Sequence, residues 1–393
     1  MLLLVSAAVL LGMSEWFTAS AAGPDLQIRW ELSMTQVGWL TTVVQLGFVA
    51  GTAVAALLNL ADVFPSRAYF AVSALAAAAA NAALLVVPGF AVALAARFAT
   101  GFFLAGVYPP GMKMIATWFR SARGFAIGTV VGALTVGKAT PYLLKAAGGP
   151  GVTSVILGAS LAGCLASVLV LTAYRDGPYP FGRRPFSWAQ VLDVFGDRRT
   201  MLATGGYLGH MWELYAMWAT VSVYFTDFFA TPAGGSTVGG FHAAELVAFG
   251  VIASGGAGAV VAGAWADRWG RERTTMWMMA LSGSCAVMMG WVLPLSAWVV
   301  VPLALAWGFT IVADSAQFSA CVTEVAPRHA IGTALTLQTS LGFALSAVSV
   351  QSTVWLAEVG GWRLAYGVLA VGPVLGILAM GRLRAERHVK PVG

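Results

Sequence analysis

Residues 71–87 read AVSALAAAAANAALLVV, and every side chain in this stretch except Ser73 and Asn81 is alanine, leucine or valine. A transmembrane β-strand would show about ten residues of alternating polarity, and this stretch does not alternate. In lipid, backbone N–H and C=O groups must be hydrogen-bonded within their own segment. A continuous apolar run of this length therefore predicts a membrane-spanning helix.

The rest of the chain repeats this pattern. Of its 393 residues 59% are hydrophobic and 10% are charged, whereas soluble domains carry about 25% charged residues. A spanning helix needs about 20 mostly apolar residues. Twelve such stretches cover residues 2–22, 36–58, 68–88, 90–112, 123–145, 152–174, 200–226, 243–265, 275–293, 297–321, 332–356 and 362–381. The predicted fold class is an all-α integral membrane protein with twelve transmembrane helices in the lipid bilayer.

Two other readings of the sequence are not favoured. Met1 to Leu11 has no basic region before it and further spans after it, so it is read as part of the first span and not as a secretory leader. The cysteines and histidines are scattered, which predicts no disulfide framework, no metal, no cofactor and no enzymatic centre. They are Cys164, Cys285, Cys321, His210, His242, His329 and His388.

The distribution of basic residues between the loops predicts the orientation. Cytoplasmic loops carry an excess of lysine and arginine. On the side of the termini these residues are Arg67, Arg120, Arg123, Arg175, Arg183, Arg184, Arg198, Arg199, Arg268, Arg271, Arg273, Arg328, Arg382, Arg384, Arg387 and Lys390, against Arg29, Lys145 and Arg363 on the other side. Both termini are predicted to lie in the cytoplasm, and the protein is predicted to lie in the inner membrane. The net charge of +6 then needs no nucleic-acid partner.

A proline-rich and arginine-rich break divides the spans into six and six. It predicts an N-terminal bundle at 1–174, a cytoplasmic linker at 175–199, a C-terminal bundle at 200–381 and a cytoplasmic tail at 382–393. Residues 186–195 have apolar side chains at helical spacing, which fits either a short amphipathic helix or an ordinary linker. Gly101-Phe102 returns 207 residues later as Gly308-Phe309. Two repeats of this kind imply a site near the bilayer midplane, between the halves.

One loop carries a family resemblance. Residues 263–273 read GAWADRWGRER, which resembles the signature loop of the major facilitator superfamily, mostly monomeric transporters. The resemblance implies that its residues form charge contacts that hold the two halves together in one state of the transport cycle. The corresponding loop at 59–67 keeps the aspartate but not the glycines. The gating residues implied are Asp62, Arg67, Gly263, Asp267, Arg268, Gly270 and Arg271.

Further segments resemble parts of the same family. RFATG at 97–101 is similar to a motif whose arginine is implicated in proton transfer, here Arg97. VYPPGMK at 107–113 resembles the permeases grouped with nitrate, nitrite and cyanate porters. Residues 36–58 and 243–265 contain no arginine, so the nitrate-binding arginines of those porters are lacking. None of these motifs names a substrate.

Ionisable side chains inside the predicted spans are candidates for the transport site, because a charge near the bilayer centre costs about 2.5–3.5 kcal/mol even on the most lenient scale. Counting about 1.5 Å per residue places four of them near mid-depth: Glu15, Lys138, His210 and Glu213. His210 and Glu213 share a helix face, so the imidazole could bind the carboxylate as a proton relay or as a structural pair. A buried lysine such as Lys138 must pair with an anion or lose its proton, and the candidate anions are Glu15 and a bound substrate.

Four more residues complete the predicted site. Asp314 lies one turn before Gln317, in a segment polar enough to line water. Arg97 and Tyr108 are three turns apart on one predicted helix, where Arg97 is read as a structural residue that extends to the surface. Trp212 adds aromatic surface beside Glu213.

The leading functional hypothesis is a secondary transporter of a small polar solute, with an anion as one candidate, coupled to protons or working by exchange. The alternative within transport is a proton-driven exporter of cationic or amphipathic compounds, for which Glu15, Glu213 and the aromatic side chains would form the site. A non-transporting sensor built on the same fold is a third class. Removal of Lys138 should abolish the first activity and spare the second.

Overall fold

The computed structural model describes residues 1–119, 123–147, 151–179, 187–230, 237–238 and 241–389, and these are almost entirely helical. The elements before the predicted linker are α1 (Leu2–Met13), α2 (Thr18–Ala21), α3 (Gly23–Trp30), α4 (Met34–Leu57), α5 (Leu60–Val63), α6 (Ser66–Ala82), η1 (Ala83–Leu85), α7 (Phe90–Leu104), α8 (Tyr108–Ala116), α9 (Arg123–Ala146) and α10 (Gly151–Ala173). Those that follow are α11 (Trp188–Gly196), α12 (Arg198–Phe229), β1 (Thr237–Val238), β2 (Phe241–His242), α13 (Ala243–Trp269), α14 (Arg271–Trp291), α15 (Ala297–Ala313), α16 (Ser315–Val325), α17 (Ile331–Leu369) and α18 (Val371–Val389).

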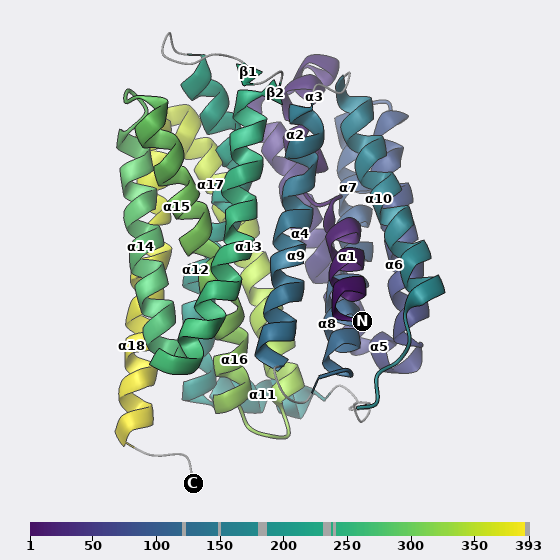
Figure 1. The fold of residues 1–393 in the computed structure, drawn as a ribbon, viewed down its shortest axis with the longest axis vertical. Helices are drawn as coiled ribbons and strands as arrows, with labels where there is room; N and C mark the ends of the chain where they lie inside the picture. The colour runs from purple at the N-terminus through teal and green to yellow at the C-terminus, as the bar shows by residue number, and fades with distance from the viewer. Residues whose placement is uncertain (120–122, 148–150, 180–186, 231–236, 239–240, 390–393) are drawn as a thin grey trace.

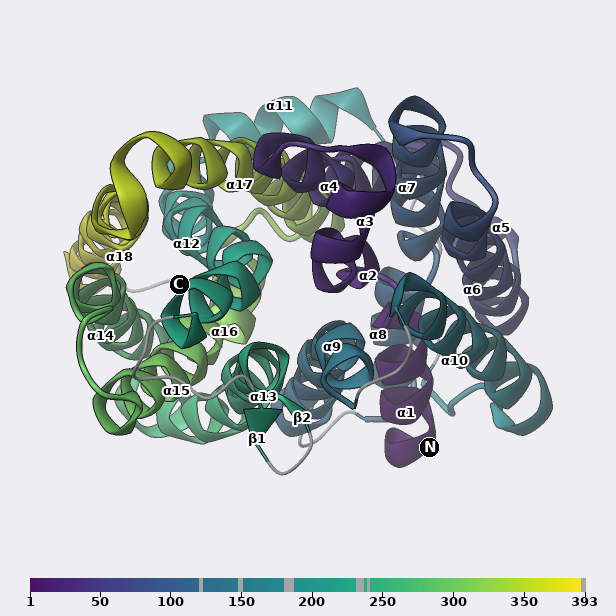
Figure 2. The same cartoon turned by 90° about the horizontal axis from the view of Figure 1, so that it is seen from above.

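Helices α1–α10 pack mainly on one another, and so do helices α12–α18. We call these sets the N-terminal group and the C-terminal group. They meet mainly along two pairs of helices, α9 with α13 and α4 with α17 (Figure 2). Figure 1 shows α3 and the short β-hairpin at one end of the molecule, and α11 and the last turns of α18 at the other. These are called the α3 end and the α11 end below.

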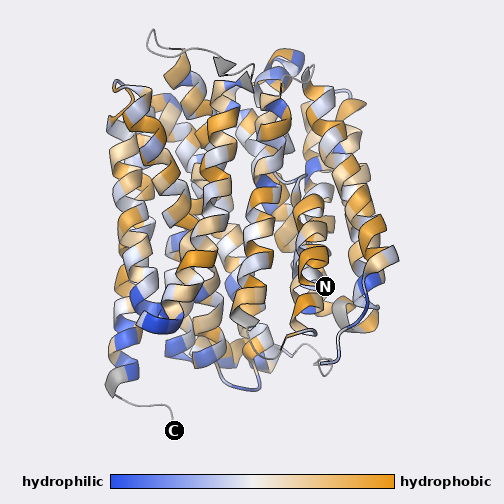
Figure 3. Cartoon of the chain, in the orientation of Figure 1, coloured by the Kyte–Doolittle hydropathy of each residue, from blue (hydrophilic) through white to orange (hydrophobic). Residues whose placement is uncertain are grey.

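The helices are those of a multi-pass membrane protein. Among the described residues, eight helical segments are long and apolar enough to cross a membrane. One of them, Ile331–Arg387, has 57 residues, far more than the roughly 20 that one crossing needs, and it kinks at Gly361, where φ is 69°. Helices α12 and α14 are long but carry more polar residues. The count of twelve spans therefore stays a prediction. Figure 3 shows hydrophobic residues along the helices and hydrophilic residues gathered at the α11 end of α13, α14 and α18.

Four predicted spans are not continuous helices, which corrects their description as single helices. The first is interrupted at residues 14–17, between α1 and α2. The fourth is interrupted between α7 and α8, where Pro109 and Pro110 begin the second piece and cannot donate a backbone N–H to the preceding turn. The tenth is interrupted at Asp314. The twelfth, 362–381, is interrupted at Ala370, between α17 and α18. Irregular backbone at membrane depth needs protein partners. Two of the breaks also hold buried polar side chains, Ser14 and Glu15 in the first span and Asp314 in the tenth.

The predicted linker contains a short helix, α11, which was one of the two alternatives that its apolar spacing allowed. Trp188 and Leu192 of α11 are 69% and 72% exposed. Its polar side chains attach it to α17, because Gln190 accepts from Thr333 at 2.9 Å and Asp193 lies 2.8 Å from His329. Residues 180–186 of the predicted linker lie outside the described part of the chain.

Candidate functional site

Lys138 lies where the two groups meet, and aromatic rings surround it. It projects from α9 and is 1% exposed. Its ammonium donates a hydrogen bond to the hydroxyl of Tyr215 on α12. Its Nζ also lies 3.8 Å from the ring centroid of Trp16, 4.6 Å from that of Tyr215 and 5.7 Å from those of Trp218 and Phe343. These four rings, which we call the Lys138 cage, stabilise the cation through their negative faces.

The cage leaves several hydrogen-bond donors without an acceptor. The indole nitrogens of Trp16 and Trp218 are buried and have no partner among the described residues. The amide nitrogen of Gln45, on α4, is also buried without a hydrogen-bond partner among the described residues. The amide oxygen of Gln45 accepts a hydrogen bond from Ser346 Oγ at 2.9 Å. A tryptophan nitrogen is only a donor. The centre of the molecule therefore holds a cation and free donors, which is a surrounding that favours an acceptor ligand.

Glu15 is not the partner of Lys138, which corrects the first of the two pairings considered from sequence. It lies in the break after α1, and its carboxyl group is directed at α10, where a Cβ on Gly163 would overlap it. Both carboxyl oxygens are buried and have no hydrogen-bond partner among the described residues. The chain turns at residues 14–17, between α1 and α2. This turn directs Glu15 at α10 and away from the cage.

Arg97 holds the break in the first span and does not extend to the surface. It is fully buried. Its guanidinium donates to the backbone oxygens of Glu15 at 3.1 Å and Trp16 at 2.6 Å, and to Asn81 Oδ1 at 2.8 Å. The arginine thus satisfies carbonyl groups that the interrupted helix leaves open. The prediction that Arg97 and Tyr108 lie on one face of a single helix is also wrong. Arg97 is on α7 and Tyr108 begins α8, and residues 105–107 separate the two helices.

His210 pairs with Asp314 and not with Glu213, which corrects the second pairing. His210 Nδ1 on α12 lies 2.8 Å from Asp314 Oδ1, at the break between α15 and α16, and both side chains are buried. The ring of His210 also packs at 5.5 Å from that of Phe318. The two residues meet because α12 packs against the start of α16. The spacing of residues along one helix does not predict such a contact between helices.

Glu213 is bound by two neutral donors. Trp307 Nε1 donates to its Oε1 at 2.7 Å, and Ser282 Oγ donates to its Oε2 at 2.9 Å. Trp212 faces elsewhere, since its indole nitrogen donates to the backbone oxygen of Val368 at 3.2 Å. Lys138, His210 and Glu213 thus occupy separate buried clusters, and the structure does not bring the predicted residues together at one point.

Sequence reasoning missed several partners. Asn81, the one amide in the apolar run 71–87, was a visible signal, and so was Trp307, which directly precedes the repeated Gly308-Phe309. Phe343 and Ser282 had no such signal. Among the described residues no group of three or more histidine, cysteine, aspartate or glutamate side chains is placed to hold a metal ion.

The signature loop forms a charge network within the C-terminal group. Gly270, with φ of 87°, joins α13 to α14 in a backbone conformation that favours glycine. Arg271 binds Glu324 at 2.5 Å and Gln317 at 2.8 Å, and lies 4.0 Å from Asp267. These contacts connect α13, α14 and α16, so the expectation that they hold the two halves together is not met in this structure. Gly263 has open space beside it.

Two other predicted gating residues make no ion pair within the described residues. These are Arg67 and Arg268, which are both exposed. The side chain of Asp62 lies outside the described part of the structure.

Hydrogen bonds between the two groups lie toward the α3 end. Glu358 of α17 accepts from the backbone nitrogen of Thr35 at 3.1 Å and from its hydroxyl at 2.7 Å. Gln351 donates to Thr42 at 2.8 Å, and Tyr142 donates to the backbone oxygen of Trp218 at 3.0 Å. The bonds of Glu358 and Gln351 join the first half of α4 to the second half of α17, and the bond of Tyr142 joins α9 to α12.

Comparison with known proteins agrees with this architecture. A model of the Major Facilitator Superfamily matches residues 4–350. A bacterial homolog of the human lysosomal transporter Spinster, solved in an inward-facing and unoccupied conformation, shares the fold with a TM-score of 0.75. That match is 14% identical and covers 100% of this chain and 98% of the other. No match was found among curated protein sequences. The chain therefore belongs to the major facilitator superfamily of membrane transporters.

Proposed function

We propose that this protein is a secondary active transporter of a small anionic solute, which it moves by alternating access between its two helix groups. The observation that carries the proposal is the Lys138 cage. Lys138 is a buried lysine at the junction of the two groups with no carboxylate within 4.0 Å among the described residues, and its ammonium group keeps N–H donors for an anion. An arrangement that only held the helices together would pair the lysine with an acid.

The free donors around Lys138 support the same substrate class. The indole nitrogens of Trp16 and Trp218 would be satisfied by carboxylate or other anionic oxygens. Each buried donor left without an acceptor costs about 1–3 kcal/mol. Binding an anion there would remove this cost and add a charge-assisted bond from Lys138.

Proton coupling is the second part of the proposal. Glu15, Glu213 and the His210–Asp314 pair are buried groups that can gain or lose a proton. The His210–Asp314 pair is favoured as the coupling site because it is a buried pair of ionisable side chains that lies at the break between α15 and α16. Exchange of one anion for another needs no such group, so the pH dependence of flux separates the two modes.

A second candidate is the export of cationic or amphipathic compounds. The observation that favours it is the same set of rings, since Trp16, Tyr215, Trp218 and Phe343 together already bind an ammonium group, that of Lys138. An organic cation would take the place of Lys138 in the cage. For this activity the lysine is a competitor and not a ligand.

The remaining features are proposed on the sequence. We infer a location in the cytoplasmic membrane with both termini inside, a monomer, twelve spans and domain limits at 174 and 200, from the loop charges and the repeat. The resemblance of residues 107–113 to nitrate-porter-like permeases stays a prediction about the subgroup.

A thermal-shift screen of the purified protein tests the substrate class. Carboxylates and inorganic anions form one panel and quaternary ammonium compounds the other, because a ligand at 100 times its Kd stabilises the folded state by about 2.7 kcal/mol. The comparison protein is Lys138→Ala. The matched control is Lys145→Ala, which removes the other lysine of α9, a residue that pairs with Asp25 on α3.

The two candidates give opposite results. Stabilisation by an anion that disappears in Lys138→Ala and persists in Lys145→Ala supports the anion carrier, and proteoliposome flux of that anion follows. Stabilisation by ammonium compounds that persists or grows in Lys138→Ala contradicts it and supports the exporter.

A further inference from the structure

A second site lies at the α11 end, far from the Lys138 cage. A pocket of about 610 Å³ opens between the turn that joins α13 to α14, the end of α16 and the last turns of α18. Its charged lining includes Arg271, Glu272, Arg273, Glu324, Arg384 and Arg387. The family comparison and the proposed transport activity assign no ligand to it.

The acidic residues of this pocket already have partners. Glu324 binds Arg271 at 2.5 Å and Arg387 at 3.0 Å. Glu272 binds Arg387 at 2.5 Å, and Asp267 lies 4.0 Å from Arg271. Glu386 of α18 is also engaged, by Arg198 at 2.7 Å. Each of these carboxylates is paired with an arginine other than Arg273 or Arg384.

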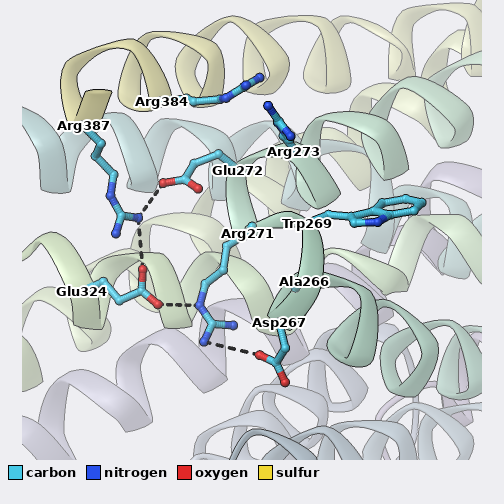
Figure 4. Close-up of a pocket in the computed structure, with 10 residues that line it drawn as sticks. Ala266, Asp267, Trp269, Arg271, Glu272, Arg273, Glu324, Arg384 and Arg387 are labelled. Carbon is cyan, nitrogen blue, oxygen red and sulfur yellow. Dashed lines mark hydrogen bonds and ion pairs between the residues drawn. The ribbon is translucent and has the colours of Figure 1, made fainter. Parts of the chain in front are cut away.

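Arg273 and Arg384 are left with no carboxylate within 4.0 Å among the described residues. In Figure 4 their side chains extend toward each other from α14 and α18, across the pocket from the Arg271–Glu324 pair. Two guanidinium groups that face each other repel unless an anion lies between them. Guanidinium groups bind phosphate oxygens with paired N–H donors, so a phosphate is the anion that this geometry fits.

Tryptophan side chains indicate that the pocket opens at the membrane surface. Trp265 and Trp269 stack with ring centroids 5.4 Å apart, on the last turns of α13, and are 38% and 55% exposed. Trp277, two turns into α14, is 63% exposed. Exposed tryptophans of this kind lie at the level of lipid headgroups, where basic pockets between helices bind acidic headgroups.

We propose that Arg273 and Arg384 bind an anionic phosphate group, and that this pocket is a phosphate site separate from the transport site. The phosphate of an acidic phospholipid would enter from the side of the tryptophans, with its acyl chains along α14. Free phosphate would enter from the aqueous face. The bound group would tie α14 to α18 next to the signature loop.

The test is a thermal-shift titration of the full-length protein in an uncharged detergent. The probes are dihexanoyl phosphatidylglycerol, dihexanoyl phosphatidylcholine and inorganic phosphate. The test variant is Arg273→Gln with Arg384→Gln. The matched control is Arg175→Gln with Arg382→Gln, which removes the same charge from two exposed arginines that do not line the pocket.

The proposal expects a saturable rise in melting temperature with phosphatidylglycerol or inorganic phosphate, and at least about tenfold weaker binding in the test variant, because two charge-assisted contacts are lost. The control variant should respond like the unmodified protein. The probe that acts at the lower concentration identifies the source of the phosphate.

Three results would overturn it: no saturable response to either anionic probe, an equal response to phosphatidylcholine, or equal losses in both variants. If the double variant does not fold, Arg273→Gln and Arg384→Gln are compared singly with Arg382→Gln. Binding of a probe that is lost in Arg273→Gln with Arg384→Gln and kept in Lys138→Ala belongs to this pocket and not to the Lys138 cage, so failure of this site and failure of the proposed transport activity are separate results.

Discussion

Arg97 and Lys138 are both buried cations in the N-terminal group, and the protein accommodates them in different ways. Arg97 donates to the backbone oxygens of Glu15 and Trp16 and to Asn81, so its donors are used in holding the chain. Lys138 donates to one tyrosine and is otherwise surrounded by rings. The first is a structural residue, and the second keeps donors for a ligand.

Arg97→Ala should destabilise the protein strongly. The substitution leaves buried carbonyl groups at the break without donors, and each such group costs about 1–3 kcal/mol. We expect a clearly lower melting temperature in detergent, whereas Arg175→Ala, at an exposed position, should stay close to the unmodified protein. Equal melting temperatures for the two variants would show that the hydrogen bonds of Arg97 do not support the break.

A double-mutant cycle on His210→Ala and Asp314→Ala should give a coupling energy of about 0.5–3 kcal/mol, as for side chains in direct contact. The stability of each variant is measured by thermal or denaturant unfolding. The cycle on His210→Ala and Glu213→Ala is the control, because Glu213 binds Trp307 and Ser282 instead. A larger coupling in the control cycle would restore the pairing that the sequence suggested.

The ionisable residues that the sequence placed near mid-depth, Glu15, Lys138, His210 and Glu213, are all buried, but their partners were not predicted. His210 and Glu213 are three residues apart, which made them neighbours on one helix. The actual partner of His210, Asp314, comes from a helix more than one hundred residues later. Hydropathy and spacing describe one helix at a time, so contacts between helices stay invisible to them.

At the scale of elements, the two groups interrupt corresponding helices at corresponding positions. Helix α15 begins 207 residues after α7, and α16 begins 207 residues after α8. This is the offset that relates Gly101-Phe102 to Gly308-Phe309 in the sequence. The sequence therefore predicted the repeat but not the breaks in the helices. Hydropathy measures how apolar a segment is, and it does not report whether the backbone hydrogen bonds of a helix continue without interruption. Pro109 and Pro110 are the local sequence feature that indicates a break between α7 and α8.

Two glycines of α9 should respond oppositely to alanine. A Cβ at Gly137 would overlap the backbone oxygen of Leu10 on α1, and that atom cannot move without shifting the helix. At Gly128 nothing lies within 4 Å of the added carbon. We expect Gly137→Ala to lower the melting temperature, and Gly128→Ala to keep or raise it, since alanine is favoured over glycine in a helix by up to about 1 kcal/mol. A lower melting temperature for both would point to α9 itself and not to its packing on α1.

For the whole molecule, the hydrogen bonds between the groups close the α3 end. Thr35 with Glu358 and Thr42 with Gln351 join α4 to α17 there. Alternating access requires these bonds to break and the groups to separate at this end. Sequence predicted the membrane class and the family, which the comparison confirmed, but it held no information on which end is closed.

A cross-link at the α3 end should stop transport. In a protein whose three cysteines are replaced by serine, Gly38→Cys with Val354→Cys places two thiols within reach of each other, because a Cβ at Gly38 lies 3.7 Å from that of Val354. Oxidation should abolish flux in proteoliposomes, and a reductant should restore it. The control pair is Gly38→Cys with Thr336→Cys, whose second thiol is about 27 Å further along α17. Undiminished flux in the oxidised test pair would show that the α3 end need not open.

The Lys138 cage also sets a condition on any cationic compound that enters it. The ammonium group of Lys138 is attached to the protein that binds it, so its effective concentration at the rings is fixed by a short tether and reaches at least the millimolar range. A free cation at micromolar concentration would have to bind the rings about a thousand times more tightly to displace it. An anion faces no such competition, since it can bind the lysine where it already lies.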